Sequence, residues 1–461
     1  MRDCLYCYFF TLLVMKRNNQ YNLFKFGHSY YVFFRDFLTI YKVEDPAIVD
    51  ALSNKEETHD YCKFLNKYKK ANKDNGSIEI AKGKNSFINS LILITTDDCN
   101  LRCNYCYAVD FSKKVHEKMN FAIGKKAIDT LLKLNQEAAG YGIVFFGGEP
   151  FLNFELIRNA VLYAVEEIVE KRKKYIGFTL TTNGTILTNE IISFLKKYKI
   201  GLTISLDGDR TIHNRSRVFE NGEGSFDVIE KNIKRLKEAG IKFELRATLS
   251  PKSDLFRVVS FFENKQIPFG YGLVMDTKDK PKANTHFLES DIDNLKHMLG
   301  KINDYYFEKI KEGKRIFLQN IQSGLTRIVY RKGKEINCTA GRSTIAINTN
   351  GTILPCQNFI NYKDLFKQEF NEYYNSETPE FRAPVVDNLV SCESCWAKYL
   401  CAGGCFFEKH VENNDIESPP KTKCALTLMQ WEYIIKLYVK LHENNLLSNK
   451  ILISQKQNHY V

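Results

Sequence analysis

The sequence of 461 residues predicts an α/β protein whose main part is a partial barrel of six strand–helix units. Short apolar runs alternate six times with amphipathic stretches between residues 89 and 312, as in a parallel sheet with helices outside it. A closed barrel of this kind has eight units, so six units predict an open one. We expect four regions: an N-terminal module (1–88), the barrel (89–312), a cysteine-rich domain (313–425) and a C-terminal helix and tail (426–461).

The N-terminal module begins with an apolar stretch from Cys4 to Met15. This stretch is too short to span a bilayer and is followed by Lys16 and Arg17 instead of a small-residue cleavage site. We therefore expect a short appendage, or a chain that starts at Met15, more than a signal peptide. The lone pair of Cys4 and Cys7 indicates little.

The rest of the module predicts strands followed by helices. Three aromatic and β-branched runs predict a meander, and two helical stretches and a polar linker follow, at residues 21–26, 30–34, 38–43, 46–52, 57–69 and 70–85. This order predicts a small winged-helix-like α+β fold. Peptide binding, DNA binding and a structural cap are the alternatives for it, although no basic recognition helix stands out.

The barrel units follow from periodicity. Strands are expected at residues 90–95, 142–146, 177–181, 202–206, 242–248 and 269–274, and helices at 121–134, 154–170, 189–197, 226–239 and 254–264. Working residues of βα barrels gather at the C-terminal ends of the strands. Polar and metal-binding residues that directly follow each strand are therefore the site candidates.

Composition limits the class of protein. The chain is 44% hydrophobic and 26% charged, as expected of a soluble globular protein. Its net charge of +12 comes from lysines spread along the chain, which predicts a solvated surface and no nucleic-acid or membrane partner. The thirteen cysteines cluster at metal-ligand spacings, so we expect a reducing cytoplasm and not disulfides.

Three cysteines follow the first barrel strand: Cys99, Cys103 and Cys106. They supply three soft ligands and no fourth, and thiolates select iron–sulfur clusters, copper(I) or zinc. A closed zinc site uses four ligands, so it explains the triplet less well. A [4Fe–4S] cluster held by three cysteines keeps one iron open for a substrate or cofactor.

Later strand ends carry polar signals. The second ends in Gly147-Gly148-Glu149-Pro150, where paired glycines allow a close backbone approach and a carboxylate can bind an amine. The third and fourth end in Thr181-Thr182-Asn183-Gly184 and Ser205-Leu206-Asp207-Gly208, which suit a ribose or a carboxylate or serve only as turns. Arg215 and Arg217 follow, as carboxylate forks or surface ion pairs.

A second cysteine constellation lies after residue 330: Cys338, Cys356, Cys392, Cys395, Cys401, Cys405 and Cys424. The stretch 343–354, with Asn350-Gly351 at its centre, predicts a β-hairpin with a type I′ turn. This hairpin would bring Cys338 and Cys356 close together. Zinc binding by the cysteines from 392 to 405 is an alternative.

The spacing C-x3-C-x2-C, with Tyr105 before the last cysteine, and the Gly-Gly-Glu-Pro motif resemble the radical SAM superfamily. The seven later cysteines resemble the SPASM domain, so the resemblance covers residues 89–425. It implies three [4Fe–4S] clusters and S-adenosylmethionine (SAM). The SAM contacts that it implies are Tyr105, Gly147, Gly148, Glu149, Asn183, Ser205, Asp207 and Arg217.

The resemblance also implies how the later cysteines divide. Cys392, Cys395, Cys401 and Cys424 hold an outer cluster, and Cys338, Cys356 and Cys405 hold an inner one with a free site. Relatives that close this site carry a further cysteine at the position of Lys332. An open iron could anchor a substrate thiolate. A water molecule, a distant side chain or Cys62 are the alternatives.

The activity that the resemblance implies is maturation of a ribosomal peptide. A 5′-deoxyadenosyl radical removes a carbon-bound hydrogen, and a cysteine thiolate then couples to that carbon as a thioether. The segment 217–226 also resembles such maturases, in which the N-terminal module grips a precursor leader as an added strand. The expected partners are a Cys-rich precursor peptide and a one-electron donor such as flavodoxin or ferredoxin. An anaerobic sulfatase maturase, a carbon–carbon cross-linking maturase and an electron-transfer protein are the alternatives.

Overall fold

The structure is a computed structural model, and it describes residues 21–54, 58–74, 79–81, 88–109, 116–275, 287–365, 382–413, 415 and 417–447. The apolar stretch from Cys4 to Met15 lies outside the described residues. In the described part of the chain, no helix is both long and apolar enough to cross a membrane.

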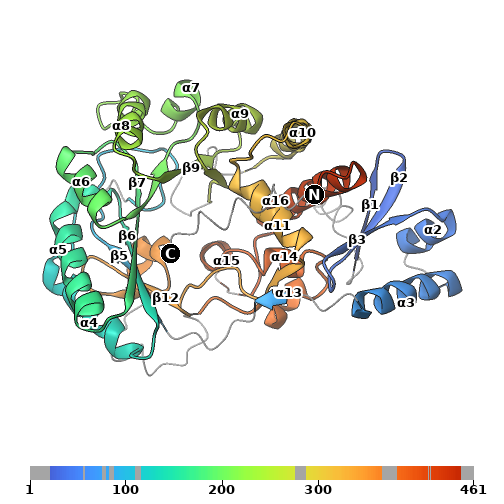
Figure 1. Cartoon of the computed structure of the whole chain (residues 1–461), viewed down its shortest axis with the longest axis horizontal. Helices are drawn as coiled ribbons and strands as arrows, with labels where there is room; N and C mark the ends of the chain where they lie inside the picture. The colour runs from blue at the N-terminus through green and yellow to red at the C-terminus, as the bar shows by residue number, and fades with distance from the viewer. Residues whose placement is uncertain are drawn as a thin grey trace, which may run out of the picture.

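The predicted parallel sheet is confirmed, and it lies in the left half of the molecule in Figure 1. Its six strands pair in chain order and each begins and ends within two residues of its prediction. They are β5 (Ser90–Ile94), β6 (Gly140–Phe146), β7 (Tyr175–Thr182), β8 (Gly201–Ser205), β9 (Phe243–Leu249) and β10 (Phe269–Leu273).

Amphipathic helices cover the outer face of this sheet, and the C-terminal region lies on the side of its inner face (Figure 1). These helices are α4 (Phe121–Leu134), α5 (Phe154–Ala164), α6 (Asn189–Lys197), α7 (Arg210–Asn214), α8 (Phe226–Glu238) and α9 (Leu255–Lys265). The helix expected to end at residue 170 changes to a π-helical turn over Val165–Glu170. Asn120, Thr188 and Asp254 cap α4, α6 and α9 with side-chain oxygens.

The predicted hairpin extends the sheet at its β5 edge. β12 (Thr344–Ile347) pairs in parallel with β5 and antiparallel with β13 (Ile353–Leu354). The type I′ turn is wrong, because that turn needs positive φ at both central residues and only Gly351, at φ +92°, has it. The Gly351 amide instead donates 2.9 Å to the Asn348 carbonyl.

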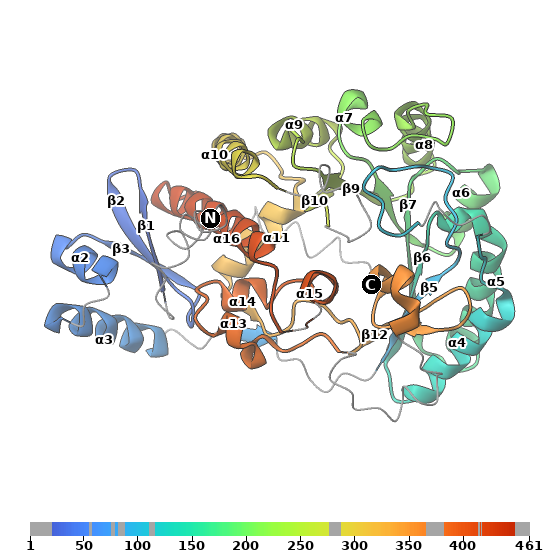
Figure 2. The same ribbon diagram turned by 180° about the vertical axis from the view of Figure 1, so that it is seen from behind.

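The N-terminal module is a three-stranded antiparallel sheet with two helices, as the order of strands and helices predicts. Its elements are β1 (Tyr21–Phe26), β2 (Ser29–Phe34), β3 (Thr39–Val43), α2 (Pro46–Asn54) and α3 (His59–Asp74). One face packs on these helices and the other joins the main core, where the Phe33 ring meets that of Trp396 edge-on at 5.7 Å. Figure 2 shows the module at the end of the molecule away from the barrel helices.

The linker predicted after the module is partly wrong. α3 runs on to Asp74, and β4 (Glu79–Ala81) pairs in parallel with β11 (Lys332–Lys334). A polar sequence without periodicity gives no sign of such a pairing, because the partner strand lies some 250 residues away.

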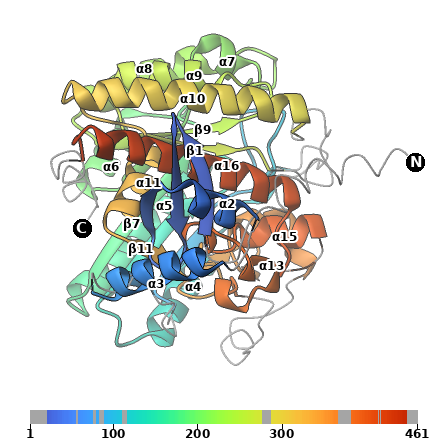
Figure 3. The ribbon, with the colours of Figure 1, turned by 90° about the vertical axis from the view of Figure 1, so that its right-hand side faces the viewer.

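The C-terminal region joins two long helices to short turns around the cysteines. Figure 3 shows α10 (Glu289–Lys311) and α16 (Lys421–Glu443) as two long neighbouring helices, and they contact each other. Between them in the chain lie α11 (Gln319–Val329), α13 (Val390–Glu393), α14 (Lys398–Cys401) and α15 (Phe406–Asn413), with the 3-10 segments Gln357–Leu365 and Val386–Asn388.

Candidate active site

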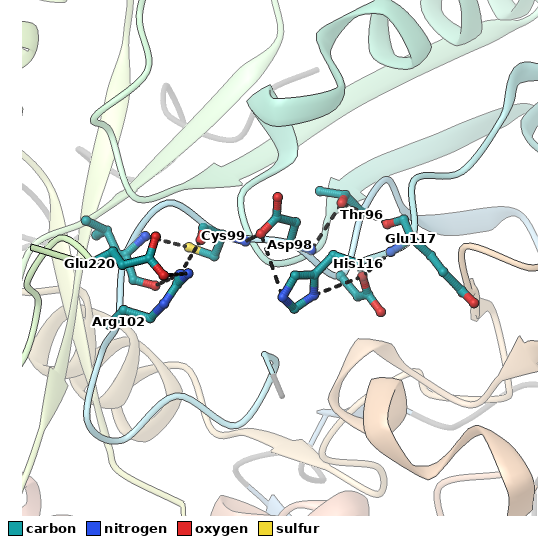
Figure 4. A network of polar contacts seen from close by, with 9 residues as sticks. Thr96, Asp98, Cys99, Arg102, His116, Glu117 and Glu220 are labelled. Atoms are coloured by element: carbon teal, nitrogen blue, oxygen red, sulfur yellow. Dashed lines mark hydrogen bonds and ion pairs between the residues drawn. The ribbon is translucent and has the colours of Figure 1, made fainter. Parts of the chain in front are cut away.

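The loop that carries Cys99, Cys103 and Cys106 follows β5 and is fixed by a chain of hydrogen bonds (Figure 4). The Asp98 amide donates 3.1 Å to the Thr96 hydroxyl, which itself donates 2.9 Å to the Glu117 carbonyl. These bonds hold the start of the loop in place before any ligand is bound.

Arg102 ties the middle of this loop to the segment after β8. Its guanidinium donates 2.6 Å to the Cys99 carbonyl and 2.8 Å to the Glu220 carboxylate (Figure 4). Its amide donates 2.7 Å to the Val218 carbonyl. The segment 217–226 therefore supports the cysteine loop.

The three thiols are held among protein atoms. Burial raises the pKa of Cys99 and raises that of Cys103 to about 12, and the three sulfurs are close enough to interact electrostatically. Cys99 Sγ accepts from the Leu101 amide at 3.4 Å and from Asn183 Nδ2 at 3.7 Å. Because metal ligation needs thiolates, cluster assembly must displace these protons.

The two glycines of the Gly-Gly-Glu-Pro motif pack against the start of the cysteine loop. A Cβ at Gly147 would lie 2.4 Å from the Thr96 carbonyl oxygen, and one at Gly148 would lie 2.0 Å from that of Asp98. Their close approach is thus to the chain itself, and it fixes Glu149 beside the loop.

Glu149 is a fully buried carboxylate at the end of β6. It accepts hydrogen bonds from the Thr182 hydroxyl at 2.7 Å, the Asn183 amide at 2.7 Å and the Phe151 amide at 3.2 Å. Burial raises its pKa to about 7, and it forms no ion pair among the described residues. A buried carboxylate without a cation fits a cationic ligand such as the α-ammonium group of SAM.

Asp207, Arg217 and Tyr105, three further predicted SAM contacts, bind one another. Arg217 Nε donates 2.9 Å to Asp207 Oδ2, the Tyr105 hydroxyl donates to the same oxygen, and the Arg217 guanidinium lies 5.4 Å from the centre of the Tyr105 ring. The Thr248 amide donates 2.9 Å to the other oxygen of Asp207. Many of the hydrogen-bond donors and acceptors of these three side chains are therefore bonded to one another or to the backbone, beside Cys103.

His213 supports the group of Asp207, Arg217 and Tyr105 through hydrogen bonds. It accepts from the Asp207 amide at 3.2 Å through Nδ1, and its Nε2 lies 2.9 Å from the Ser225 hydroxyl. Burial lowers its pKa to about 4, so the ring is neutral at pH 7. Ser205 ends β8 and is half-buried.

The structure brings four of the C-terminal thiols together. The Cys424 thiol interacts electrostatically with those of Cys401, Cys392 and Cys395, and burial raises the pKa of Cys401 and Cys424 to about 12. Their assignment to one outer cluster stays a prediction, but the grouping is the one that it requires.

The other three C-terminal thiols form a second group. Cys356 interacts with Cys405 and Cys338, and burial raises the pKa of Cys356 to about 12. The hairpin β12–β13 leads to Cys356, which explains why residues so distant in sequence meet.

Lys409 tests whether the outer group fits an iron–sulfur cluster. Its side chain is 1% exposed, and its ammonium has no hydrogen-bond partner among the residues that the structure describes. Desolvation lowers its pKa, whereas the electrostatic interaction with the thiols of Cys392, Cys401 and Cys424 raises it. A buried cation without a hydrogen bond would be costly alone, but beside three cysteines and the Asp415 carboxylate it fits a polyanionic cluster.

Within the described residues, no three His, Cys, Asp or Glu side chains are close enough to hold a single metal ion. A cubane cluster takes each ligand on a different iron atom, so its sulfurs lie farther apart than those around one ion. Groups of three or four cysteines are donor sets that [4Fe–4S] clusters use, and zinc is still an alternative for the group of four.

The sequence reasoning missed Tyr107, which lies between two of the cysteine groups. Its phenol is half-buried and interacts electrostatically with Cys356, Cys106 and Cys405, and desolvation raises its pKa. Its hydroxyl donates 2.8 Å to Asn358 Oδ1. An aromatic directly after the third cysteine was its only sequence signal. It shows that the core triplet and the inner group face each other.

Known proteins share this architecture. Residues 93–255 match the Radical SAM superfamily. A protein of Methanocaldococcus jannaschii called "Uncharacterized protein MJ0907" is 31% identical over 233 residues, which are 50% of this chain and 74% of that protein. The chain belongs to the radical SAM superfamily of enzymes.

Two further relatives and one solved structure are similar to a larger part of this chain. The "Cysteine-type anaerobic sulfatase-maturating enzyme" of Clostridium novyi (strain NT) is 24% identical, with 69% of this chain and 87% of that protein covered. The "Antilisterial bacteriocin subtilosin biosynthesis protein AlbA" of Bacillus subtilis (strain 168) is 25% identical, with 65% and 60% covered. The solved structure "Native anSMEcpe with bound AdoMet" has the same fold, with a TM-score of 0.66, 21% identity, and 77% of this chain and 99% of that chain covered.

Proposed function

We propose that this enzyme forms thioether links between cysteine sulfur and carbon in a ribosomally made peptide. The observation that carries this proposal is the inner group of three thiols, Cys338, Cys356 and Cys405, which faces the core triplet across Tyr107. Three ligands leave one iron of a [4Fe–4S] cluster open, and a substrate thiolate is a suitable fourth ligand.

Two side chains, those of Cys62 and Glu408, could compete for this fourth position. Cys62 lies in α3, at the end of the molecule opposite the barrel and away from α15 (Figures 1 and 2). Glu408 lies near Cys405, but its carboxylate forms an ion pair with Lys423 at 3.1 Å. Neither supports a closed inner cluster.

The residues of the chain bind and orient, and the cofactors supply the chemistry. When bound, the clusters and SAM supply the electron and the 5′-deoxyadenosyl radical that removes a hydrogen from the peptide. Glu149 would hold the SAM ammonium group, and the paired Asp207 and Arg217 keep Tyr105 in position beside the core cysteines. Tyr107 and its partner Asn358 fill the space between the two cysteine groups.

We further propose that the N-terminal module, residues 1–88, binds the leader of the precursor peptide. In its sheet order, β1 and β3 are edge strands among the described residues, and an edge strand can accept a peptide as an added strand. A one-electron donor such as flavodoxin or ferredoxin would reduce the clusters.

Sulfatase maturation is the second candidate. The Clostridium novyi relative and the shared fold of the solved structure favour it. The inner group of three thiols favours thioether formation instead, because an enzyme that oxidises a side chain to an aldehyde needs no iron open to a substrate sulfur.

The test is anaerobic incubation of reconstituted enzyme with SAM, dithionite and candidate Cys-rich peptides. Each link replaces one C–H and one S–H bond by a C–S bond, so a loss of two hydrogens per link, with the cysteine blocked to alkylation, is expected. A hydrazide-reactive aldehyde would instead indicate sulfatase maturation. Cys356→Ala should abolish the links, and Cys62→Ala is the matched control. Full activity of Cys356→Ala would contradict the proposal.

A further inference from the structure

Arg246 is an unpaired cation on the inner face of the barrel sheet. Along β9, Phe243, Leu245, Ala247 and Leu249 are buried toward the outer helices, so Arg246 points to the opposite face. Its side chain is exposed, although desolvation lowers its pKa. It forms no hydrogen bond or ion pair with any described residue.

The carboxylate of Glu244 on the same face interacts electrostatically with Arg246, but its hydrogen bonds go to other groups. Glu244, two residues earlier, accepts 3.1 Å from the Thr203 hydroxyl and 2.7 Å from Gln319 Nε2. It lies beyond ion-pair distance of Arg246. The guanidinium therefore keeps all five of its N–H groups for a partner from outside.

Two glycines of β10 make room for this guanidinium. A Cβ at Gly270 would lie 2.9 Å from Arg246 Nη1, and one at Gly272 would lie 3.2 Å from Nη2. Arg246 pairs with Gly270 on one side and with Ser205 of β8 on the other. Its side chain thus extends over bare β10 backbone, away from β8 and from the Glu149 end of the sheet, where we place SAM.

We propose that Arg246 binds a carboxylate of the substrate peptide, either an acidic side chain or the C-terminal carboxylate. The inference rests on the proposed function, because it names the substrate feature that the same site selects. A planar guanidinium binds a carboxylate through two parallel hydrogen bonds, and such a pair is strong where water is partly excluded. Because Gly270 and Gly272 have no side chains, the space beside the guanidinium is left free for this carboxylate.

The test measures peptide binding by the reconstituted enzyme and does not depend on turnover. The probes are two matched sets of fluorescein-labelled dodecapeptides that contain Cys. Each peptide of the first set carries a single Glu, placed at a different one of the remaining positions, and the second set carries Gln in its place. Both sets are made with amidated and with free C-termini. Wild-type enzyme should prefer a carboxylate over its amide at one position by about tenfold or more, as a charge-assisted pair predicts. Arg246→Gln should lose this preference, and Arg246→Lys should keep part of it.

Further variants keep the test decisive. Gly270→Ala, which displaces the guanidinium and keeps its charge, should also lower the preference, and Arg158→Gln on the outer helix α5 should leave it unchanged. A wild-type enzyme without a carboxylate preference, or a preference that survives in Arg246→Gln, would overturn the proposal. A roughly tenfold rise in the Kd for SAM in Arg246→Gln, with an unchanged peptide preference, would also overturn the proposal, because it would assign Arg246 to the SAM carboxylate. A carboxylate preference without thioether products would instead refute the proposed function alone.

Discussion

The two cysteine-rich regions of the protein are held in place by different means. The core loop is fixed by barrel side chains, since Arg102, Asn183 and Thr96 bond its backbone, its sulfur or its first residues. Three of the four outer cysteines instead lie on turns or on α13 and α14, helices of four residues each, and Cys424 lies in the first turn of the long helix α16. Helices this short are not stable by themselves. The outer region also buries the unpaired ammonium of Lys409.

We infer from this difference that the sheet preforms the core loop, whereas the outer region would need a bound cluster to be stable. A preformed loop suits a cluster that must present one iron to SAM in a fixed geometry. Where a cluster only carries electrons, the metal itself can supply the folding free energy. Four experiments test the comparison, in order of decreasing effect.

Removal of iron should affect the outer region most. We expect hydrogen exchange of residues 386–401 to rise by roughly a hundredfold, equivalent to about 3 kcal/mol of lost local stability. Exchange of β5 to β10 should change little, because their hydrogen bonds do not involve the cysteines. Hydrogen-exchange mass spectrometry of apo and reconstituted protein measures both. Equal deprotection of the two regions would contradict the comparison.

Glu149→Gln tests the preformed side of the comparison. The change should raise the Kd for SAM by tenfold to roughly a hundredfold, because it removes a buried anion that pairs with a cation. The raised pKa of about 7 means that Glu149 loses its charge as pH falls, so wild-type affinity should weaken between pH 8 and pH 6. The variant should show no such weakening. Calorimetric SAM titrations at both pH values provide the measurement, and an equal pH dependence in both proteins would refute this role.

Lys409→Met tests the region that depends on its cluster. Removal of the buried positive charge should lower the reduction potential of the outer cluster, since the reduced cluster carries more negative charge. We expect a decrease of roughly 60 mV, a tenfold change in a one-electron equilibrium. Redox titration followed by electron paramagnetic resonance measures it, with the exposed Lys421→Met as control. An unchanged or higher potential would show that the ammonium does not face the cluster.

Tyr107→Phe tests the contact between the core loop and the inner group of cysteines. Loss of the hydrogen bond to Asn358 should lower the free energy of unfolding by about 1 kcal/mol, because the partly buried amide oxygen loses a donor. Denaturant titration under anaerobic conditions measures it. Tyr175→Phe, at an exposed tyrosine of β7, is the matched control and should leave stability unchanged.

The barrel could be predicted well from the sequence because a local pattern of residues identifies each strand and each helix. α4 and α6 begin and end at the predicted residues, where caps and apolar periodicity coincide. The pairing of β4 with β11 and the position of Tyr107 could not be predicted, because both depend on partners far along the chain. The mutual pairing of Asp207 and Arg217 was hidden for a related reason, since spacing shows which residues are near a site but not whether they bind each other.

The contact between Phe33 and Trp396 has a practical consequence for anyone who shortens this chain. Trp396 is completely buried, and part of its cover comes from the N-terminal sheet. A truncation that begins at the barrel would expose an indole next to Cys395 and open a route for oxygen to the outer cysteines. We expect the brown colour of bound iron–sulfur clusters to fade sooner in air in such a fragment than in the whole enzyme.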